Sequence, residues 1–212
     1  MEIAEPMTMI TDYIVTIYTF VLAILLFINF SYTNHPAVWY LGITLVITGI
    51  GALLGGSAHG FKPSISEKQH NFLWKGTTIS LGFAAFFLLL ASIKSSSSNS
   101  SFITSMNAVA VLQLMIYLYW IRNHDEFLYV IVNYLFAMIL VVILKIYSFI
   151  TIADQSSIWI LGSIIVSIVA SGIQAKKIGI HPKYFNHNDL FHVIQLPGFY
   201  LLYKAAFFLP HL

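Results

Sequence analysis

Cysteine is absent from the chain, and charged residues make up only 8% of it. The lack of cysteine excludes disulfide bonds and thiolate metal ligands, so any metal would have to be held by nitrogen and oxygen atoms. The formal net charge of +2 is too small to indicate nucleic-acid binding. The chain is instead rich in apolar residues: 58% are hydrophobic, and the mean hydropathy is +0.84. This composition predicts a polytopic membrane protein.

Lysine and arginine are also missing from the first residues, Met1 to Pro6. A secretory signal peptide begins with a basic segment, so none is predicted. Apolar runs follow, each long enough to cross a bilayer of about 30 Å as a helix. They lie at about residues 9–31, 37–60, 70–94, 102–121, 127–150, 157–175 and 189–209. The sequence therefore predicts an all-α, seven-transmembrane-helix bundle that forms one domain over residues 1–212, with its termini on opposite sides of the membrane.

Basic residues are distributed unevenly between the two sides that this topology defines. The side with the N-terminus holds most of them: Lys62, Lys68, Lys75, Arg122, Lys176, Lys177 and Lys183. The other side has Lys94, Lys145 and Lys204, each near a helix end from which its side chain is expected to reach the interface. By the positive-inside rule, the N-terminus is predicted to be cytoplasmic and the C-terminus outside. A bacterial inner membrane is the default location, and the serine-rich outer loop 95–101 is predicted to be a flexible connector.

Polar residues gather at the predicted cytoplasmic ends of the helices. Asp12 lies about one turn inside the first helix, and His59 lies near the end of the second. The last helix opens with His187, Asp189 and His192, of which the last two are three residues apart and so share one helical face. Ionisable groups are costly at membrane depth and usually face a bundle interior or a partner. We therefore expect helix ends that are far apart in the sequence to bring imidazoles and carboxylates together.

These groups can be interpreted in two ways. Asp12 and Asp189 stand in first helical turns, where a carboxylate caps free N–H groups and complements the helix dipole. His59 and His192 lie inside helix ends, and neutral imidazole is the commonest metal ligand. A divalent ion held by two or three histidines and a carboxylate would satisfy several costly groups at once, and zinc with an open coordination position is the usual catalytic form. A metal-free hydrogen-bonded network is the alternative.

In these features the chain resembles the CREST superfamily of seven-helix membrane proteins, which includes alkaline ceramidases, progestin/adipoQ receptors, haemolysin III proteins and Per1-like proteins. Members carry a serine and a histidine near the end of helix 2, an aspartate early in helix 3, and His-x-x-x-His at the start of helix 7. His59 matches the helix 2 histidine, and His192 matches the second histidine of helix 7. The family serine falls on Gly55, with Ser57 two residues before His59.

The remaining family positions carry different residues. The first histidine of the helix 7 pair falls on Asn188, next to His187, and the helix 3 aspartate falls near His70 or Asn71. The resemblance therefore implies His59 and His192 as metal ligands, with His187 as the first candidate for a third ligand and His70 as the second. Three residues are the candidates for catalytic groups: Asp12, Asp189 and Ser57.

The resemblance also implies an activity. A zinc-dependent membrane hydrolase would act on a lipid amide or ester from the inner leaflet, with zinc-bound water as the nucleophile. The partners expected are membrane lipids and a lipid substrate or ligand. The alternative is a non-catalytic seven-helix sensor or receptor with a structural metal or a polar network. A proton- or metal-coupled transporter is a further possibility, although few ionisable groups lie mid-membrane.

Overall fold

The computed structural model describes residues 2–31, 35–182 and 184–210, and α-helices make up most of this part of the chain. Their bounds are α1 (Pro6–Asn29), α2 (Pro36–Phe61), α3 (Glu67–Lys94), α4 (Ser100–Ile121), α5 (Leu128–Ile152), α6 (Ser156–Ala175) and α7 (His187–Ala205). Two 3₁₀ turns, η1 (Lys62–Ser64) and η2 (Ala206–Phe208), follow α2 and α7. The described ranges contain no β-strand, so the all-α prediction is confirmed.

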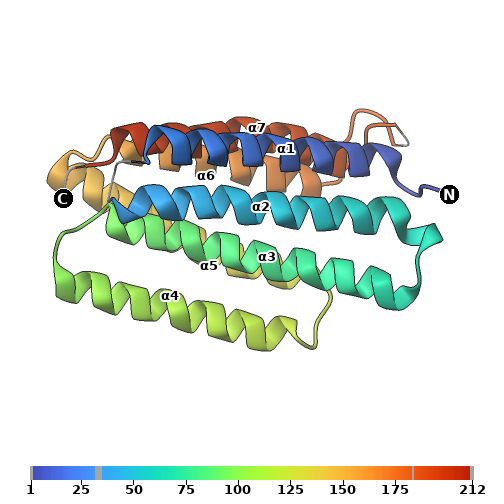
Figure 1. The fold of residues 1–212 in the computed structure, drawn as a ribbon, viewed down its shortest axis with the longest axis horizontal. Coiled ribbons are helices and arrows are strands. Elements are labelled where there is room, and N and C mark those ends of the chain that lie inside the picture. Colours follow the sequence, from blue (N-terminus) through green and yellow to red (C-terminus); the bar gives the residue numbers. More distant parts are fainter. Residues whose placement is uncertain (1, 32–34, 183, 211–212) are drawn as a thin grey trace.

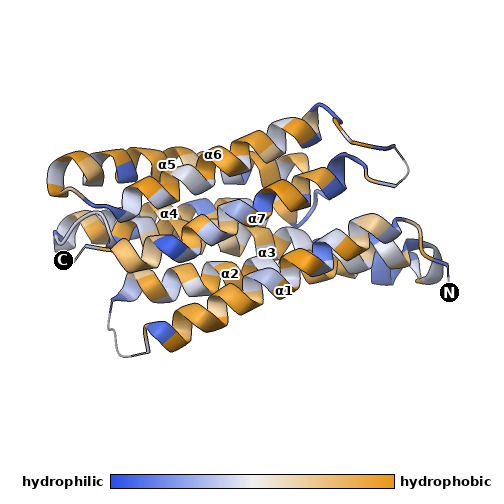
Figure 2. Cartoon of the chain, turned by 90° about the horizontal axis from the view of Figure 1, so that it is seen from above, coloured by the Kyte–Doolittle hydropathy of each residue, from blue (hydrophilic) through white to orange (hydrophobic). Residues whose placement is uncertain are grey.

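Six of these helices, α1 to α6, are long and apolar enough to cross a membrane. The helix α7 differs from the sequence prediction: it runs from His187 to Ala205 instead of reaching residue 209, and it is not among the six. The reason lies in its composition, because its first half carries five polar residues, His187, Asn188, Asp189, His192 and Gln195, and Pro197 interrupts its middle. Figure 2 shows hydrophilic positions along α7 among mostly hydrophobic helices.

Six of the helices form a ring, in which α7 packs between α1 and α6. In this ring α1 packs between α2 and α7, α3 packs between α2 and α5, and α6 packs between α5 and α7. The helix α4 lies outside the ring against α3 and α5, at one edge of the bundle (Figure 1). All helices run along the long axis, and the N- and C-termini lie at opposite ends of the bundle (Figure 1). We call these the N-terminal end and the C-terminal end.

The interior of the ring is divided into an apolar half and a polar half. Leu26, Leu45, Leu89, Val141 and Ile160 belong to one buried apolar cluster, which fills the half nearer the C-terminal end. In the other half the buried side chains of α1 are largely polar: Thr8, Thr11, Asp12, Thr16 and Thr19. Because buried hydroxyls bond mostly to the carbonyls of their own helix, they can line an interior at little cost. The polar half is where α1, α2 and α7 begin or end together.

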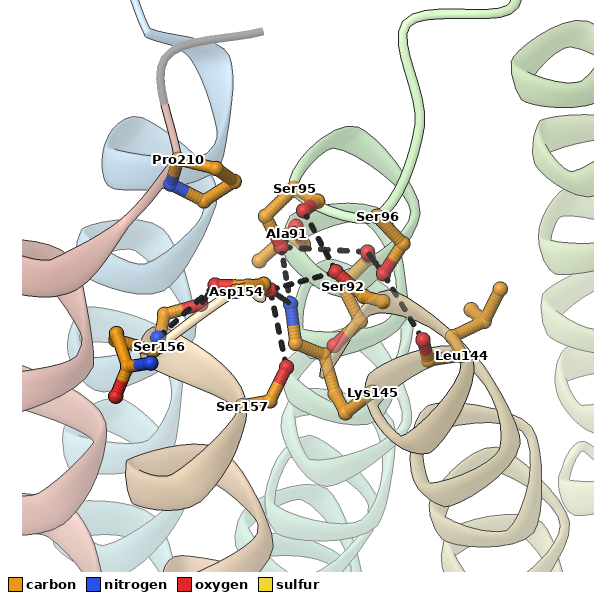
Figure 3. Close-up of polar contacts among 12 residues, drawn as sticks. Ala91, Ser92, Ser95, Ser96, Leu144, Lys145, Asp154, Ser156, Ser157 and Pro210 are labelled. Atoms are coloured by element: carbon orange, nitrogen blue, oxygen red, sulfur yellow. Dashed lines mark hydrogen bonds and ion pairs between the residues drawn. The ribbon is translucent and has the colours of Figure 1, made fainter. Parts of the chain in front are cut away.

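A buried ion pair, which the sequence did not predict, lies at the C-terminal end of the bundle. The Nζ atom of Lys145 on α5 lies 2.6 Å from Oδ2 of Asp154, and both side chains are 0% exposed (Figure 3). The prediction that Lys145 reaches the membrane interface is therefore wrong. Its ammonium group also donates to Ser95 Oγ at 2.7 Å, so it is neutralised and hydrogen-bonded inside the protein.

Serine hydroxyls complete the hydrogen bonding of this ion pair. Asp154 accepts hydrogen bonds from the hydroxyls of Ser148, Ser156 and Ser157 and from the backbone N–H of Ser156. Burial alone would raise the pKa of Asp154, but the Lys145 ammonium and the hydrogen bonds outweigh it and hold that pKa below its usual value. The carboxylate is therefore ionised and fully satisfied.

The loop 95–101 was predicted to be a flexible connector, but its first two residues are packed inside the bundle. Ser95 and Ser96 are buried, at 0% and 1% exposure, because they extend the end of α3 into the ion-pair cluster. The Asn99 side chain accepts a hydrogen bond from the backbone N–H of Phe102 and caps α4. A run of serines taken alone predicts a solvated linker. Serine hydroxyls can also donate to and accept from the two members of a buried ion pair at a helix end.

Candidate functional site

The first two turns of α1 present polar side chains to two neighbouring helices at the N-terminal end. The contact with α2 is close because that helix carries glycine there: a Cβ added at Gly56 would lie 2.7 Å from Asp12 Cβ, and one added at Gly60 would overlap Met9. Only residues without a side chain allow this approach of the two backbones. On its other side α1 packs against α7, so Asp12 is enclosed between α2 and α7 and is 5% exposed.

The carboxylate of Asp12 meets the imidazole of His192 on α7. Asp12 Oδ1 lies 3.3 Å from His192 Nε2, and His192 Nδ1 lies 2.9 Å from Thr11 Oγ1. The Thr11 hydroxyl has one hydrogen, which it donates to the Thr8 carbonyl at 3.0 Å. When that bond is kept, the hydroxyl accepts from His192 Nδ1, and a neutral ring then has a lone pair on Nε2 facing a carboxylate oxygen, which is favourable only with a proton or a cation between them. When the hydroxyl turns to donate to Nδ1, Nε2 carries the hydrogen and donates to Asp12 Oδ1.

Asp189 and Asn186 hold the start of α7 in place against α1. Asn186 is the N-cap of α7, and Asp189 Oδ2 accepts from the Asn186 backbone N–H at 2.7 Å, which closes a capping box. Asp189 Oδ1 accepts from the Thr8 hydroxyl at 2.8 Å. The capping interpretation is therefore confirmed for Asp189. It is wrong for Asp12, because α1 begins at Pro6 and Asp12 lies beyond its first turn, in the buried interface.

His59 reaches the same region from α2, and Glu5 orients it. His59 Nδ1 lies 3.3 Å from Oε1 of Glu5, the residue just before α1. A carboxylate only accepts hydrogen bonds, so Nδ1 carries a hydrogen, and in the neutral ring Nε2 keeps a lone pair. The hydrogen bond from His59 lowers the pKa of Glu5 below its usual value, so Glu5 is ionised. His59 is close enough to Asp12 and His192 to interact electrostatically with both.

One buried atom in this cluster lacks a partner. Asp12 Oδ2 is buried and forms no hydrogen bond. It lies near Gly55: a Cβ added at Gly55 would be 3.9 Å from Asp12 Oδ2 and 3.4 Å from Thr77 Cγ2, both ordinary van der Waals contacts. Buried carboxylate oxygens are almost always hydrogen-bonded or coordinated, so an unpartnered one calls for an explanation.

The other candidates from the sequence lie outside this cluster. His70 and His187 are partly exposed, and neither takes part in the contacts that join Asp12, His192 and His59. The Ser57 hydroxyl donates to the Leu53 carbonyl at 2.7 Å and lies 3.0 Å from the Tyr13 hydroxyl, so it serves the α1–α2 contact. The structure thus brings together Asp12, His59 and His192, with Asp189 one contact away through Thr8.

The donor set fits a divalent cation in kind. Two imidazoles each have one nitrogen anchored, by Glu5 or by Thr11, which is the usual way a protein fixes a ligand histidine. The unpartnered Asp12 Oδ2 adds a carboxylate oxygen. Nitrogen and oxygen donors of this type suit zinc. In their present arrangement, no three His, Asp or Glu side chains of the described residues are placed closely enough to hold a metal.

Sequence reasoning missed Glu5, Thr8 and Thr11 as members of the site. Their spacing carried a signal: Glu5 and Thr8 lie three residues apart, and Thr8 lies three and four residues before Thr11 and Asp12, so on a helix these side chains are neighbours. Threonine is common in apolar helices and Glu5 precedes a proline, so neither residue type by itself indicated a functional site.

No curated protein and no solved structure matches this chain. A family model does match it, over residues 7–210, which include α7 and all of α1 except its first residue. The match thus covers Asp12, His59 and His192 together with nearly all of the helical bundle. The chain belongs to this family, which is described as a family of unknown function (DUF6962).

Proposed function

We propose that this protein is a seven-helix membrane hydrolase that binds a divalent cation, zinc, through Asp12, His192 and His59. Its substrate would be a lipid amide or ester taken from the leaflet at the N-terminal end of the bundle. On this proposal, the resemblance to the CREST superfamily reflects common descent, with Asp12 in place of the family's helix 3 aspartate.

One observation carries the proposal. Asp12 Oδ2 is buried without a hydrogen-bond partner, and Asp12 Oδ1 lies 3.3 Å from His192 Nε2, where two lone pairs face each other when the ring hydrogen is on Nδ1. A cation beside them removes the repulsion between the lone pairs and supplies a partner for Asp12 Oδ2. The same cation explains why Glu5 fixes His59 with its Nε2 lone pair available.

The chain's own residues would divide the remaining work. When bound, the cation supplies Lewis-acid activation of water and of an acyl carbonyl. Asp12 would hold the cation through Oδ2, and its other oxygen, Oδ1, would accept the proton that water gives up and pass it to the leaving group. Thr11 and Glu5 would keep the two imidazole rings oriented, and Asp189 would hold the first turn of α7 against Thr8.

The proposed orientation places this site on the cytoplasmic side. The seventh span would be α7, which packs against α1 and α6 with its polar residues buried or half-buried. Lys145 is neutralised by Asp154 inside the bundle, so it no longer counts among the basic residues of the C-terminal end. Lys94 and Lys204 remain there, against Lys62, Lys68, Arg122, Lys176 and Lys177 among those at the N-terminal end. This sharpens the charge bias on which the positive-inside rule depends.

Metal content tests the proposal. Wild-type protein purified in detergent should contain about one zinc per chain by elemental mass spectrometry, as expected for a single site. The double variant His59→Ala, His192→Ala and the single variant Asp12→Asn should lose it. His70→Ala, a partly exposed histidine at the same end of the bundle, is the matched control and should keep it.

A panel of lipid amides and esters then tests activity. Hydrolysis by the wild type and by His70→Ala, with none by the double variant, is the expected result. Zinc retained by the double variant would remove both histidines from the site, and a well-folded wild type without metal would leave only the metal-free network.

The non-catalytic sensor or receptor remains the second candidate, and one observation favours it. Both ring nitrogens of His192 have protein partners, Thr11 and Asp12, as in a structural network in which a single proton is shared. On that proposal the protein contains no metal, or contains metal but hydrolyses no lipid of the panel.

A further inference from the structure

The loop between α6 and α7 carries a concentrated set of exposed apolar side chains. We call residues 176–186, with residue 183 left out, the α6–α7 loop. Within it Ile180 is 75% exposed, Tyr184 62% and Ile178 49%. Figure 1 shows the loop projecting from the side of the bundle at the N-terminal end. Three large apolar residues facing water within seven positions indicate an interaction surface, since each is costly to hydrate.

The loop is built in a defined shape. The backbones of His181 and Phe185 exchange two hydrogen bonds, of 2.9 and 3.0 Å, and the Ile180 N–H also donates to the Phe185 carbonyl. Gly179 lies so close to the next segment that an added Cβ would be 2.9 Å from the Asn186 carbonyl carbon. The apolar residues are therefore displayed by a turn that ends at Asn186, the cap of α7.

The charge of the loop points to the chemistry of its partner. Lys176 and Lys177 are both exposed and directly precede Ile178. The sequence from 176 to 186 contains no aspartate or glutamate. Cationic residues beside exposed aliphatic and aromatic ones match an anionic lipid surface, where ammonium groups meet phosphates and apolar side chains enter the boundary between headgroups and acyl chains. The position of the loop beside helices long enough to span a membrane places such a surface within its reach.

We propose that the α6–α7 loop is an interfacial anchor that binds the anionic lipid surface surrounding the N-terminal end of the bundle. Ile178, Ile180 and Tyr184 enter the headgroup boundary, and Lys176 and Lys177 contact lipid phosphates. Because the loop ends at Asn186, the anchor also fixes the depth at which α7 begins. The inference does not depend on the presence of a metal.

The absence of cysteine makes the test direct, because a single introduced cysteine can be labelled. Ile180→Cys would carry a nitrobenzoxadiazole fluorophore in full-length protein reconstituted into vesicles of phosphatidylcholine, with or without phosphatidylglycerol. The probe at position 180 should emit at a blue-shifted wavelength and be quenched by lipids that carry a doxyl group near the headgroup. Quenching should be stronger with phosphatidylglycerol, and adding Lys176→Ala and Lys177→Ala should remove that increase.

Asn123→Cys provides the control, since Asn123 is an exposed residue in the α4–α5 loop at the same end of the bundle. A probe there should be quenched by aqueous iodide and not by the doxyl lipids. The proposal is overturned if the probe at position 180 behaves like the one at position 123. It is overturned equally if position 180 is shielded from both quenchers, which would mean that protein covers the loop, or if its quenching is the same without phosphatidylglycerol.

Discussion

Asp154 at the C-terminal end of the bundle and Asp12 at the N-terminal end are both buried, but their surroundings differ. Asp154 accepts hydrogen bonds from Lys145, Ser148, Ser156 and Ser157, and neither of its oxygens lacks a partner. Asp12 has one oxygen 3.3 Å from His192 Nε2 and no partner for the other. The Lys145–Asp154 pair is sealed from solvent, whereas His59 and Glu5 next to Asp12 are 27% and 39% exposed.

This difference separates a structural role from a binding role. A buried ion pair with every atom satisfied gains nothing from a ligand, and here it joins the end of α3 to the α5–α6 turn. A buried carboxylate with an unsatisfied oxygen is unfavourable by itself, and it persists in proteins chiefly where a ligand, a cation or a proton completes it. The comparison therefore supports a structural role for the C-terminal end and the proposed binding role for the N-terminal end.

The two ends of the bundle are expected to differ most in the side of the membrane on which they lie. An impermeant thiol reagent added to intact cells should label Ser98→Cys and leave Asn123→Cys unlabelled, because the proposed orientation puts these exposed loop residues on opposite sides of the membrane. Permeabilised cells, in which both should react, are the control. Labelling of position 123 alone would reverse the orientation and place the site outside.

A matched pair of substitutions tests the two aspartates. Asp154→Asn leaves the Lys145 ammonium buried without a counter-charge and should cost about 3–5 kcal/mol of stability. In metal-free protein, Asp12→Asn replaces one acceptor by an amide that can donate to His192 Nε2, so its cost, compared with metal-free wild type, should be below about 1 kcal/mol. Thermal unfolding in detergent measures both.

Replacing both members of the Lys145–Asp154 pair by apolar residues tests whether the uncompensated charge causes the loss of stability in Asp154→Asn. Lys145→Met with Asp154→Leu should recover much of the stability lost in Asp154→Asn, because replacing both members of a buried ion pair is often close to neutral. Equal melting temperatures for Asp154→Asn and Asp12→Asn would remove the distinction between the two ends.

The smallest expected effect is the pH dependence that Glu5 contributes. Its pKa is depressed by the hydrogen bond from His59, so its contribution to stability is present above the usual glutamate value of 4.5 and is lost as the pH falls through its lower folded value. Since Glu5 is 39% exposed, screening keeps the contribution well below about 1 kcal/mol. The melting temperature of the wild type should fall more steeply below that pH than that of Glu5→Gln. Glu2→Gln, at an exposed residue, should leave the wild-type profile unchanged.

Much of the fold could be predicted because its signals are local. The apolar runs gave the helices to within a few residues, apart from α7, whose end the apolar residues after Ala205 obscured. The capping role of Asp189 was also local, since Asn186 and Asp189 have the spacing of a capping box. His59, His192 and Asp12 were expected to meet from their shared depth at one end of the bundle.

The partners within the site could not be predicted, because they depend on how each helix is rotated about its axis. Thr11 and His192 are 181 residues apart, and Glu5 and His59 are 54 apart. A turn of α1 by one residue position would have faced Ile10 or Tyr13 toward α7 instead. Lys145 was assigned to the interface because a lysine near a helix end usually snorkels, and only the packing of α5 against α3 and α6 shows that it points inward.

The sequence by itself determined that this chain is a helical protein rich in membrane-spanning segments, with its ionisable groups concentrated at one end. Hydropathy and helical periodicity are properties of neighbouring residues, so both can be determined from the sequence without knowledge of the fold. The tertiary structure alone decided which of the buried charges is satisfied and which is not. Whether a group is hydrogen-bonded depends on differences of a few tenths of an ångström in distances between helices that are remote in sequence. For that reason the buried Lys145–Asp154 ion pair and the unpartnered oxygen of Asp12 became visible only in three dimensions.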